Sequence, residues 1–354
     1  MLIAIHKSID QQDTYATGWA ECLAARDVDV RWVDLTALDA LSQVQDCDGV
    51  MWHWCHTVHD KMIYRALNVI ELNLGIPVFP NHDSSWHRRD KLSQYYLLQT
   101  AGAPMPNTWV FWDKQKAREW ALQTDYPKVF KLASGGGGKD VVLISSSQQA
   151  CRLIDSMFGA GLYSGQIIRS ITGAIPNNWR EVRELASRCQ DAARYVASGQ
   201  PPSSPLLERG YVYFQEFVPD IDHRTGITVI GHRAFGSREP NRFNGPNGFR
   251  PHSENYDPSK IDLRCLQTAF EISERLDFQF MAYEFLLHPD GPLVLEMNFR
   301  NGKTRGYWNR NLEWISEPMC PQEAQVEVFL NEICSRKRAM TREKAPRVSR
   351  GEDA

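Results

Sequence analysis

Short apolar runs alternate with amphipathic segments through the first 85 residues of the chain. The runs have the length of buried strands, and the segments between them repeat every three to four residues as helices do. The predicted elements are strands at 2–5, 28–33, 49–54 and 78–79 and helices at 15–26 and 66–74. Strands that alternate with helices predict a small, Rossmann-like parallel sheet. Because this part has no glycine fingerprint, the pattern assigns no nucleotide to it.

The remainder of the chain mixes helices with hairpins, which predicts an α+β arrangement within the broad α/β class. A helix over 90–100, with Tyr96 toward the core, would end at Gly102, and Asp113 would cap a second helix over 113–123. The later elements are predicted to be a three-stranded meander, an amphipathic helix and two strands joined by a tight turn. Their ranges are 211–218, 226–231, 233–235, 261–276, 278–287 and 292–298.

A chain of 354 residues predicts two or three lobes. We expect an N-terminal domain at 1–85, followed by a small lobe at 86–210 that contains an insertion at 173–207. A large lobe is expected at 211–334. The last segment, 335–354, is basic and polar, which predicts a disordered tail.

Composition places the chain among ordinary globular proteins. Apolar residues make up 42% and charged residues 23%, and the net charge of −3 argues against a nucleic acid as partner. No run approaches the ~20 apolar residues of a membrane span, so we expect a cytoplasmic protein without one. A homodimer is one assembly that the sequence leaves open.

Eight cysteines are scattered without C-x-x-C pairs, and we expect them to be reduced and to pack as small core residues. A cluster of His and Cys that could bind a metal is His53, Cys55, His56 and His59. Its spacing is irregular, so a loop that faces the substrate or a structural polar cluster is the preferred interpretation.

The segment 126–144, YPKVFKLASGGGGKDVVLI, carries a strong chemical signal. An apolar strand that contains Lys131 runs into Ser134 and four glycines, and a second strand follows at 141–144. Glycines have no Cβ, so their N–H groups can close around an anion, and the lysine adds a positive charge. The pattern predicts a hairpin that covers phosphates; the alternative is a flexible surface turn.

Better-known phosphate motifs do not fit this segment. A P-loop requires a glycine where the chain has Ala133, and Ser or Thr where it has Asp140. A Rossmann fingerprint that starts at Gly135 also requires a glycine at position 140. The H-R-D and D-F-G motifs of a protein kinase are absent from the downstream sequence. The glycines are therefore predicted to lie between two strands, without a helix after them.

Glu284, Glu296 and Asn298 lie on two apolar strands that flank a turn. A three-residue loop at 289–291 would make Glu284 face Glu296, with all three side chains on one face. Opposed carboxylates repel each other unless a cation lies between them. Two carboxylates and an amide oxygen are hard ligands that suit Mg²⁺. A two-residue loop would instead put the glutamates on opposite faces, and two exposed glutamates are the remaining alternative.

A third feature lies between the glycine segment and this carboxylate hairpin. The strand end at 215–218 can offer backbone groups to a purine, and Asp222 can accept hydrogen bonds from ribose hydroxyls. Arg224, at the start of the next strand, can reach a phosphate or a carboxylate. The signal is weak alone and gains weight from its position between the other two features.

In order and spacing these pieces resemble the ATP-grasp superfamily over residues 1 to about 330. The matching segments are Asp90-Lys91 with the following AGAPMP, then PKVFKLASGGGGKDVVLI, YFQEFVPDIDHR and YEFLLHPDGPLVLEMN. The resemblance implies an ATP-grasp fold behind an N-terminal Rossmann-like pre-ATP-grasp domain. Within the superfamily the chain looks most like a group often found in bacterial surface-polysaccharide gene clusters. That likeness rests on DCDGVMWHW, VFPNHDSSWHRRDKLSQYYLL, NGFR and GYWNRNLEW.

The resemblance also implies ATP and Mg²⁺ as cofactors and assigns roles to residues. Two lysines and the glycine hairpin would hold phosphates, the strand at 215–218 would contact adenine, and one acid would hold ribose. The ATP-binding residues would be Lys91, Lys131, Ser134, Gly135, Gly136, Gly137, Gly138, Gln215, Glu216, Phe217, Val218 and Asp222. The Mg²⁺ ligands would be Glu284, Glu296 and Asn298.

The implied reaction is phosphoryl transfer from ATP to a small-molecule carboxylate, followed by attack of an amine or similar nucleophile on the acyl phosphate. Such a carboxylate–amine ligase depends on positioned charge and needs no side-chain nucleophile. Arg224, Arg238 and Arg250 are candidates for binding the substrate carboxylate and the developing oxyanion. An ATP-grasp kinase for a small molecule or sugar would use the same ATP and metal residues, and a non-catalytic nucleotide-binding scaffold is the third alternative.

Overall fold

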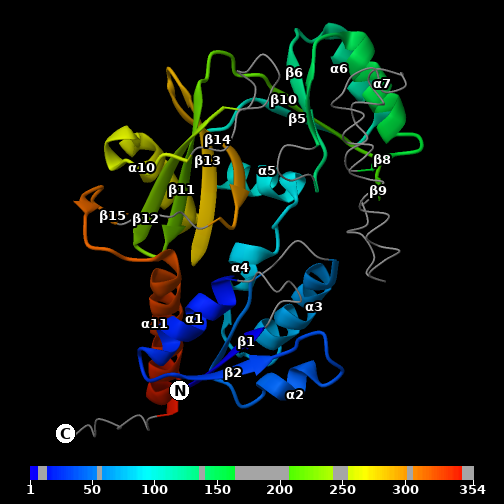
Figure 1. The fold of residues 1–354 in the computed structure, drawn as a ribbon. Helices are drawn as coiled ribbons and strands as arrows, with labels where there is room; N and C mark the ends of the chain where they lie inside the picture. The colour runs from blue at the N-terminus through cyan, green and yellow to red at the C-terminus, as the bar shows by residue number, and fades with distance from the viewer. Residues whose placement is uncertain are drawn as a thin grey trace, which may run out of the picture.

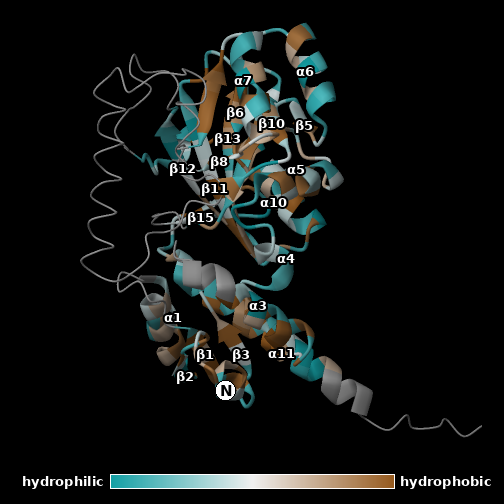
Figure 2. Cartoon of the chain, turned by 90° about the vertical axis from the view of Figure 1, so that its right-hand side faces the viewer, coloured by the Kyte–Doolittle hydropathy of each residue, from teal (hydrophilic) through white to brown (hydrophobic). Residues whose placement is uncertain are grey.

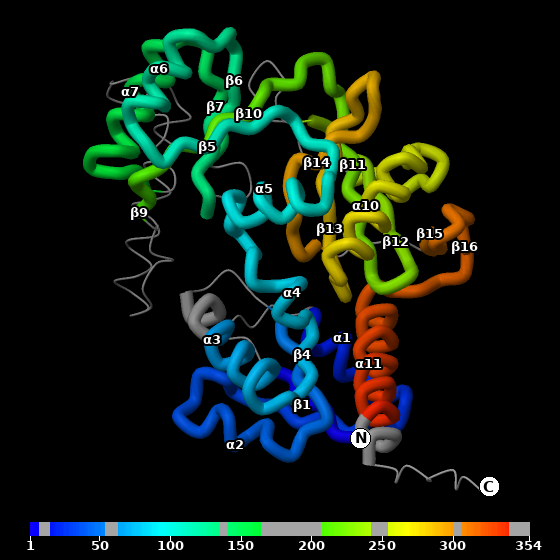
Figure 3. Tube along the Cα trace, turned by 180° about the vertical axis from the view of Figure 1, so that it is seen from behind, coloured from blue at the N-terminus to red at the C-terminus, as the bar shows by residue number. Residues whose placement is uncertain are grey.

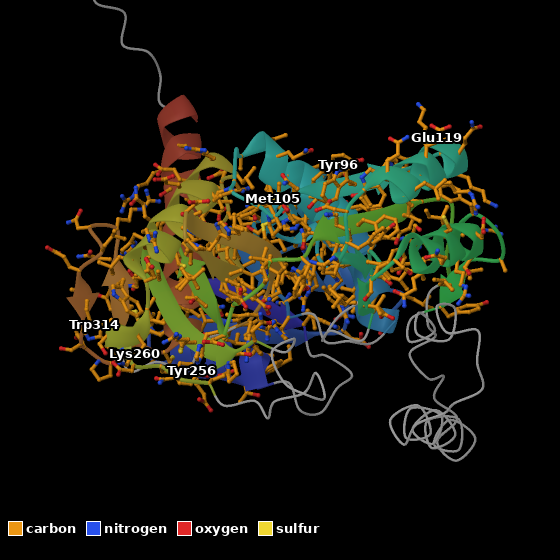
Figure 4. The ribbon with its side chains drawn as sticks, turned by 90° about the horizontal axis from the view of Figure 1, so that it is seen from above. Tyr96, Met105, Glu119, Tyr256, Lys260 and Trp314 are labelled. Atoms are coloured by element: carbon orange, nitrogen blue, oxygen red, sulfur yellow. The ribbon has the colours of Figure 1, made fainter. Side chains whose placement is uncertain are left out.

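The structure is a computed structural model of the chain. It describes residues 1–6, 14–53, 58–134, 140–163, 207–241, 254–300 and 306–344. Within these residues the N-terminal domain lies at the bottom of Figure 1, the large lobe in the middle and the small lobe at the top. Seen from above, Glu119 of the small lobe and Trp314 of the large lobe lie at opposite ends (Figure 4). The α+β class is confirmed.

The N-terminal sheet has the predicted parallel topology. Strands β1 (Leu2–His6), β2 (Asp29–Val33), β3 (Gly49–Met51) and β4 (Val78–Phe79) pair in the order β2-β1-β3-β4. The helices here are α1 (Thr14–Ala24), α2 (Ala40–Val44), α3 (Val58–Leu72) and α4 (His82–Ser85). Strands β1 and β3 are mostly buried and hydrophobic, as expected for a parallel sheet covered by helices (Figure 2). The sequence pattern did not predict α2.

The small lobe is an antiparallel sheet with helices on it. Its strands are β5 (Thr108–Phe111), β6 (Lys128–Lys131), β7 (Val141–Ile144) and β10 (Val212–Glu216), in the order β5-β10-β6-β7. Helices α6 (Lys114–Gln123) and α7 (Ser147–Met157) bury Phe130 and Phe214 against the sheet. Strands β8 (Leu162–Tyr163) and β9 (Leu207–Glu208) form a separate pair. The predicted insertion at 173–207 lies outside the described residues except for Leu207.

Strand β10 corrects the predicted meander and the lobe boundary at 211. We expected 211–218 to pair with the strands that follow it in the sequence. Instead β10 fills the gap between β5 and β6, and its inner side chain Phe214 is fully buried there. The period of the apolar residues predicts which face of a strand is buried, but it does not predict which strand is its neighbour. The neighbour is the strand beside which the apolar face is covered.

The large lobe is a six-stranded antiparallel sheet in the order β14-β13-β11-β12-β15-β16. The strands are β11 (His223–Ile230), β12 (Arg233–Pro240), β13 (Phe280–His288), β14 (Gly291–Asn298), β15 (Tyr307–Asn309) and β16 (Trp314–Ile315). A 3-10 turn, η2 (Pro258–Lys260), precedes helix α10 (Leu263–Arg275). Helix α10 covers one face of the sheet with Leu266 and Phe270, which pack on Ile227 and Tyr283. The opposite face is left for the site described below.

Helix α5 (Lys91–Thr100) joins the lobes and begins where the sequence predicted. Asp90 is its N-cap, with a carboxylate that accepts hydrogen bonds from the N–H groups of Leu92 and Ser93. Gly102, at φ +61°, ends the segment in a left-handed conformation that glycine adopts without strain. Tyr96 was expected toward the core and is instead 45% exposed.

The C-terminal helix α11 (Pro321–Lys344) returns from the large lobe to the N-terminal domain and lies beside α1 (Figure 3). Trp19 Nε1 donates to Gln325 Oε1 at 2.8 Å, and Lys337 pairs with Asp48 at 2.5 Å. Helix α11 thus runs on through residues 335–344, which corrects the predicted disordered tail over that range.

Within the described residues, none of the helices is both long and apolar enough to cross a membrane. The cysteines there are free thiols, and Cys320 is exposed, contrary to the expectation that the cysteines pack in the core. They are Cys22, Cys47, Cys151, Cys265, Cys320 and Cys334. Of the His and Cys cluster, Cys55 and His56 and the side chain of His59 lie outside the described residues, and the ring of His53 stacks on Tyr15 at 3.7 Å.

Candidate active site

Two lysines from different elements meet beside the carboxylate hairpin. Lys131 is the last residue of β6, and Lys91 is the first residue of α5. The backbone N–H of Lys91 donates to the carbonyl of Ala133 at 3.1 Å. Both side chains are buried, with 5% and 7% exposure. Lys131 Nζ donates to Gln215 Oε1 at 2.6 Å, and Lys91 Nζ lies 4.0 Å from Glu296 Oε1. Strand β6 and helix α5 therefore bring two ammonium groups together beside the carboxylate hairpin.

The pKa of Lys131 is lowered to about 8, chiefly because burial disfavours the charged ammonium. The carboxylate of Glu296 acts in the opposite direction, and the ammonium of Lys91 lowers the pKa further. Lys131 is therefore mostly protonated at neutral pH, with one neutral hydrogen-bond acceptor in Gln215. A poorly solvated ammonium of this kind favours an anionic ligand such as a phosphate.

The carboxylate hairpin has the predicted pairing but reaches it by a different route. Glu284 lies opposite Glu296, and Ala282 lies opposite Asn298. The turn, however, is a two-residue loop, because His288 pairs with Gly291. A β-bulge between Glu284 and Phe285 adds one residue on β14 and shifts the register back. The predicted three-residue loop was wrong, whereas the opposed glutamates are confirmed.

The oxygen atoms of this hairpin fit a hard cation. Asn298 Nδ2 donates to Glu284 Oε1 at 3.3 Å, while Asn298 Oδ1 is buried and has no hydrogen-bond partner among the described residues. A buried acceptor without a donor is unfavourable unless a cation satisfies it. Two carboxylates and this amide are a suitable donor set for Mg²⁺. No cluster of three His, Cys, Asp or Glu that could bind a metal occurs in the part of the chain that the structure describes.

Beside the hairpin, arginines and glutamates alternate across a small, open hollow. Arg224 binds Glu284 through Nη1 at 2.5 Å and Glu239 through Nη2 at 3.3 Å. Arg300 pairs with Glu239 and with Glu254. Glu284 and Asn298 also line the hollow, so two of the three candidate metal ligands share one space with the arginines. Charge of both signs, held on a sheet, suits a small polar substrate.

The structure places the predicted arginines differently. Arg224 lies on the face of β11 that carries Gly226 and Thr228, both in the hollow. Arg238 pairs with Thr225 in the ladder, so its side chain points to the opposite face, where its guanidinium contacts His223 Nδ1 at 3.2 Å. The structure does not bring Arg238 together with the carboxylate hairpin. Arg250 lies outside the described residues.

The remaining predicted residues lie around the end of β10. Glu216 is the last residue of the strand and accepts a hydrogen bond from Asn107 Nδ2 at 2.7 Å. Phe217 and Val218 follow, half-buried, and Asp222 is exposed just before β11. Gly135, Gly136, Gly137 and Gly138 lie outside the described residues. Strands β6 and β7 on either side of them pair from Lys131↔Val141 onward, as a hairpin requires.

Ser134 leads into the glycines and is held by a residue that sequence reasoning missed. The carboxylate of Glu208 accepts hydrogen bonds from the N–H groups of Ala133 and Ser134 at 2.9 and 3.1 Å, and from the Ser134 hydroxyl. The Tyr211 hydroxyl also donates to Glu208. This carboxylate and the burial of the phenol hold the pKa of Tyr211 well above its ordinary value. The base of the glycine segment is thereby anchored to β9.

Arg300 and Glu239 were also missed. Arg300 follows Asn298 by two positions, so the period-2 rule for strands could have placed it on the face of the metal ligands. Glu239 gave no signal, because only pairing with β11 brings it opposite Arg224. Arg89 was missed as well. Burial lowers the pKa of its guanidinium, and the Glu296 carboxylate opposes that shift.

His87, just before the lysine of α5, makes the fold sensitive to acid. Its ring is 1% exposed, stacks on Phe278 at 5.2 Å, and has no hydrogen-bond partner at either nitrogen among the described residues. Burial lowers its pKa from 6.5 to about 4. Below pH 6.5 the unfolded chain takes up a proton that the folded chain refuses, so stability falls as the pH drops toward 4.

We expect this group to remove about 3 kcal/mol of unfolding free energy between pH 6.5 and 4. Urea unfolding of the wild type and of His87→Leu at pH 7, 6, 5 and 4.5 measures it. The free energy of unfolding of His87→Leu should rise relative to that of the wild type as the pH falls. Parallel pH profiles would show that His87 titrates normally in the folded protein.

No protein-family model matches the chain, and no curated protein matches its sequence significantly. Solved structures do match its fold. D-alanine–D-alanine ligase from Bacillus anthracis has a TM-score of 0.53 at 13% identity, covering 96% of this chain and 99% of that one. The macrocyclase MdnC from Microcystis aeruginosa MRC, bound to precursor peptide MdnA, gives 0.54 at 12% identity, over 94% of this chain and 100% of that one.

The ATP-grasp ligase PsnB, in complex with precursor peptide PsnA2 and AMPPNP, gives a TM-score of 0.53 at 13% identity, over 94% of this chain and 98% of that one. These likenesses extend over nearly the whole of each chain. The protein therefore has the ATP-grasp fold, which confirms the fold that the sequence resemblance implied.

Proposed function

We propose that this chain is an ATP- and Mg²⁺-dependent ligase that activates a small-molecule carboxylate as an acyl phosphate and joins it to an amine or similar nucleophile. One observation carries the proposal. Within an ATP-grasp fold, the buried ammonium groups of Lys91 and Lys131 lie beside the opposed carboxylates of Glu284 and Glu296 and the unpaired oxygen of Asn298. Cations and hard oxygen ligands in contact suit a metal-bound polyphosphate.

Each part of the site has a proposed role. Lys91 and Lys131 would bind phosphate oxygens, with Ser134 and the glycines after it covering them. Mg²⁺, held by Glu284, Glu296 and Asn298, would offset charge on the phosphates. The backbone of 216–218, beside Gln215, would contact adenine, and Asp222 would hold ribose.

The acid substrate would bind in the hollow beside the hairpin. Arg224 and Arg300 are the guanidinium groups there, and a guanidinium binds a carboxylate through two parallel hydrogen bonds. The alternating glutamates leave room for an amine as well, because an ammonium or amine can donate to Glu254 or Glu239. Arg238 faces away and has no part in this proposal, whereas Arg250 keeps its predicted role in binding the substrate carboxylate.

A screen of ADP release with pairs of carboxylates and amines, including amino acids and sugar acids, tests the proposal. The expected result is ADP release that requires one acid and is faster with one amine, with a hydroxamate formed when hydroxylamine replaces the amine. Phosphorylation of an alcohol without an acid would identify a kinase instead. Failure to bind or hydrolyse ATP·Mg²⁺ with any acid would leave a scaffold.

A further inference from the structure

Glu284 is one of the proposed Mg²⁺ ligands, and Arg224 already binds it. The guanidinium Nη1 lies 2.5 Å from Glu284 Oε2, and Asn298 Nδ2 donates to the other oxygen, Oε1. Both oxygens of the carboxylate therefore have a donor. The pair is well shielded from water, with side-chain exposures of 12% and 19%. A charge-assisted hydrogen bond at this depth competes strongly with any cation for the same oxygens.

Arg224 has a second, separate anchor. Its Nη2 binds Glu239 at 3.3 Å, and the Glu239 side chain is only 7% exposed. Glu239 is held in turn by Arg300. The guanidinium can therefore lose its bond to Glu284 and still be held at the edge of the hollow by Glu239. One of its edges would then be available to a carboxylate in the hollow, since Arg224 lines that space.

We infer that Arg224 and Mg²⁺ compete for Glu284, so that metal binding transfers Nη1 of Arg224 from Glu284 to the carboxylate of the acid substrate. This inference rests on the proposed function, because it assumes that Glu284 is a metal ligand. Bound nucleotide with Mg²⁺ then raises the affinity for the acid. By reciprocity, a bound acid raises the affinity for the metal by the same factor.

The competition predicts that removal of Arg224 tightens metal binding. Mn²⁺, which is visible by electron paramagnetic resonance, is the probe for the metal, and its affinity is measured on the full chain saturated with ADP. Arg224→Gln should bind Mn²⁺ at least about fivefold more tightly than the wild type, the lower end of usual coupling energies. Arg300→Gln is the matched control. It removes the same charge from the same hollow, but its partners are Glu239 and Glu254, so we expect less than about a twofold change.

Arg224→Lys serves if the glutamine variant does not fold. An ammonium is a single point charge that cannot bind Glu239 and Glu284 as a fork does, so it should also tighten Mn²⁺ binding. Unchanged or weaker binding in the Arg224 variants overturns the inference. An equal gain of Mn²⁺ affinity in Arg300→Gln overturns the inference too, because the gain would then come from the loss of one positive charge in the hollow and not from competition for Glu284. A wild type that binds ADP but no Mn²⁺ contradicts the proposed metal site itself, which distinguishes the two failures.

Discussion

Replacement of Glu296 with glutamine is expected to lower ADP release by about 100- to 1,000-fold, the usual loss when one electrostatic group at a reacting centre is removed. Glu296 lies directly opposite Glu284 and 4.0 Å from Lys91, and its carboxylate acts on the Lys131 ammonium. The amide keeps the shape of the side chain and removes its charge. The lysine pair and the proposed Mg²⁺ would then lose their common counter-ion. Steady-state ADP release, with the acid that the screen identifies, measures the effect.

The matched control for this prediction is Glu119→Gln. Glu119 projects from helix α6 at the far end of the small lobe, where it accepts a hydrogen bond from Gln115 (Figure 4). Its loss should leave ADP release within about twofold of the wild type. The rate of ADP release should fall in Lys131→Ala as it does in Glu296→Gln, because this variant removes the buried ammonium on which the Glu296 carboxylate acts. If Glu296→Gln retains more than a tenth of the wild-type rate, the metal ligand set proposed here is wrong.

The carboxylate hairpin shows what the sequence could and could not predict about the site. The residue types and their spacing were enough to bring Glu284, Glu296 and Asn298 together. The loop was predicted wrongly, because a two-residue turn with a bulge gives the same pairing as a three-residue turn. Bulges depend on how β14 packs on its neighbours, and no local residue pattern marks this one. The side-chain pairing was therefore right although the backbone path was not.

The arginine and glutamate network was less predictable. Arg224 was identified from its position before a strand, but its two partners come from β12 and β13, 15 and 60 residues away. Arg238 is also an arginine, but it faces the other side of the sheet. It lies one position before Glu239, which is the residue opposite Arg224. The phase of a strand is set by which face packs on α10. The sequence could therefore supply candidate arginines, and only the fold could show which of them face the hollow.

At the level of the fold, alternation of strands and helices was sufficient for the N-terminal sheet, where each strand pairs in parallel with its neighbours. It was insufficient for β10, whose partners β5 and β6 come from about 80 or more residues earlier. It also failed for α11. There the basic composition of residues 335–344 suggested disorder, whereas Asp48 supplies a partner for Lys337. In both cases the partner lies far away in the sequence, where a local pattern does not reveal it.

Phe329→Ala is expected to lower the free energy of unfolding by about 3–5 kcal/mol, the usual loss for a buried Phe. The ring is fully buried on α11 and lies 5.8 Å from Phe79 at the end of β4. It packs so closely on β3 that a Cβ at Gly49 would lie 2.6 Å from its Cζ. The same apolar cluster contains Phe280 of the large lobe. Phe329 thus connects the N-terminal domain to the lobe that carries the carboxylate hairpin.

Urea unfolding followed by circular dichroism measures this loss, and Leu122→Ala is the control. Leu122 is an apolar residue on α6 with 67% exposure, so its truncation should change the unfolding free energy by no more than about 0.5 kcal/mol. A loss below about 1 kcal/mol in Phe329→Ala would mean that α11 adds little to the core. A loss in the expected range makes the C-terminal helix part of the frame on which the site depends, because Phe280, at the start of β13, packs in the same cluster as Phe329 and lies four residues before Glu284.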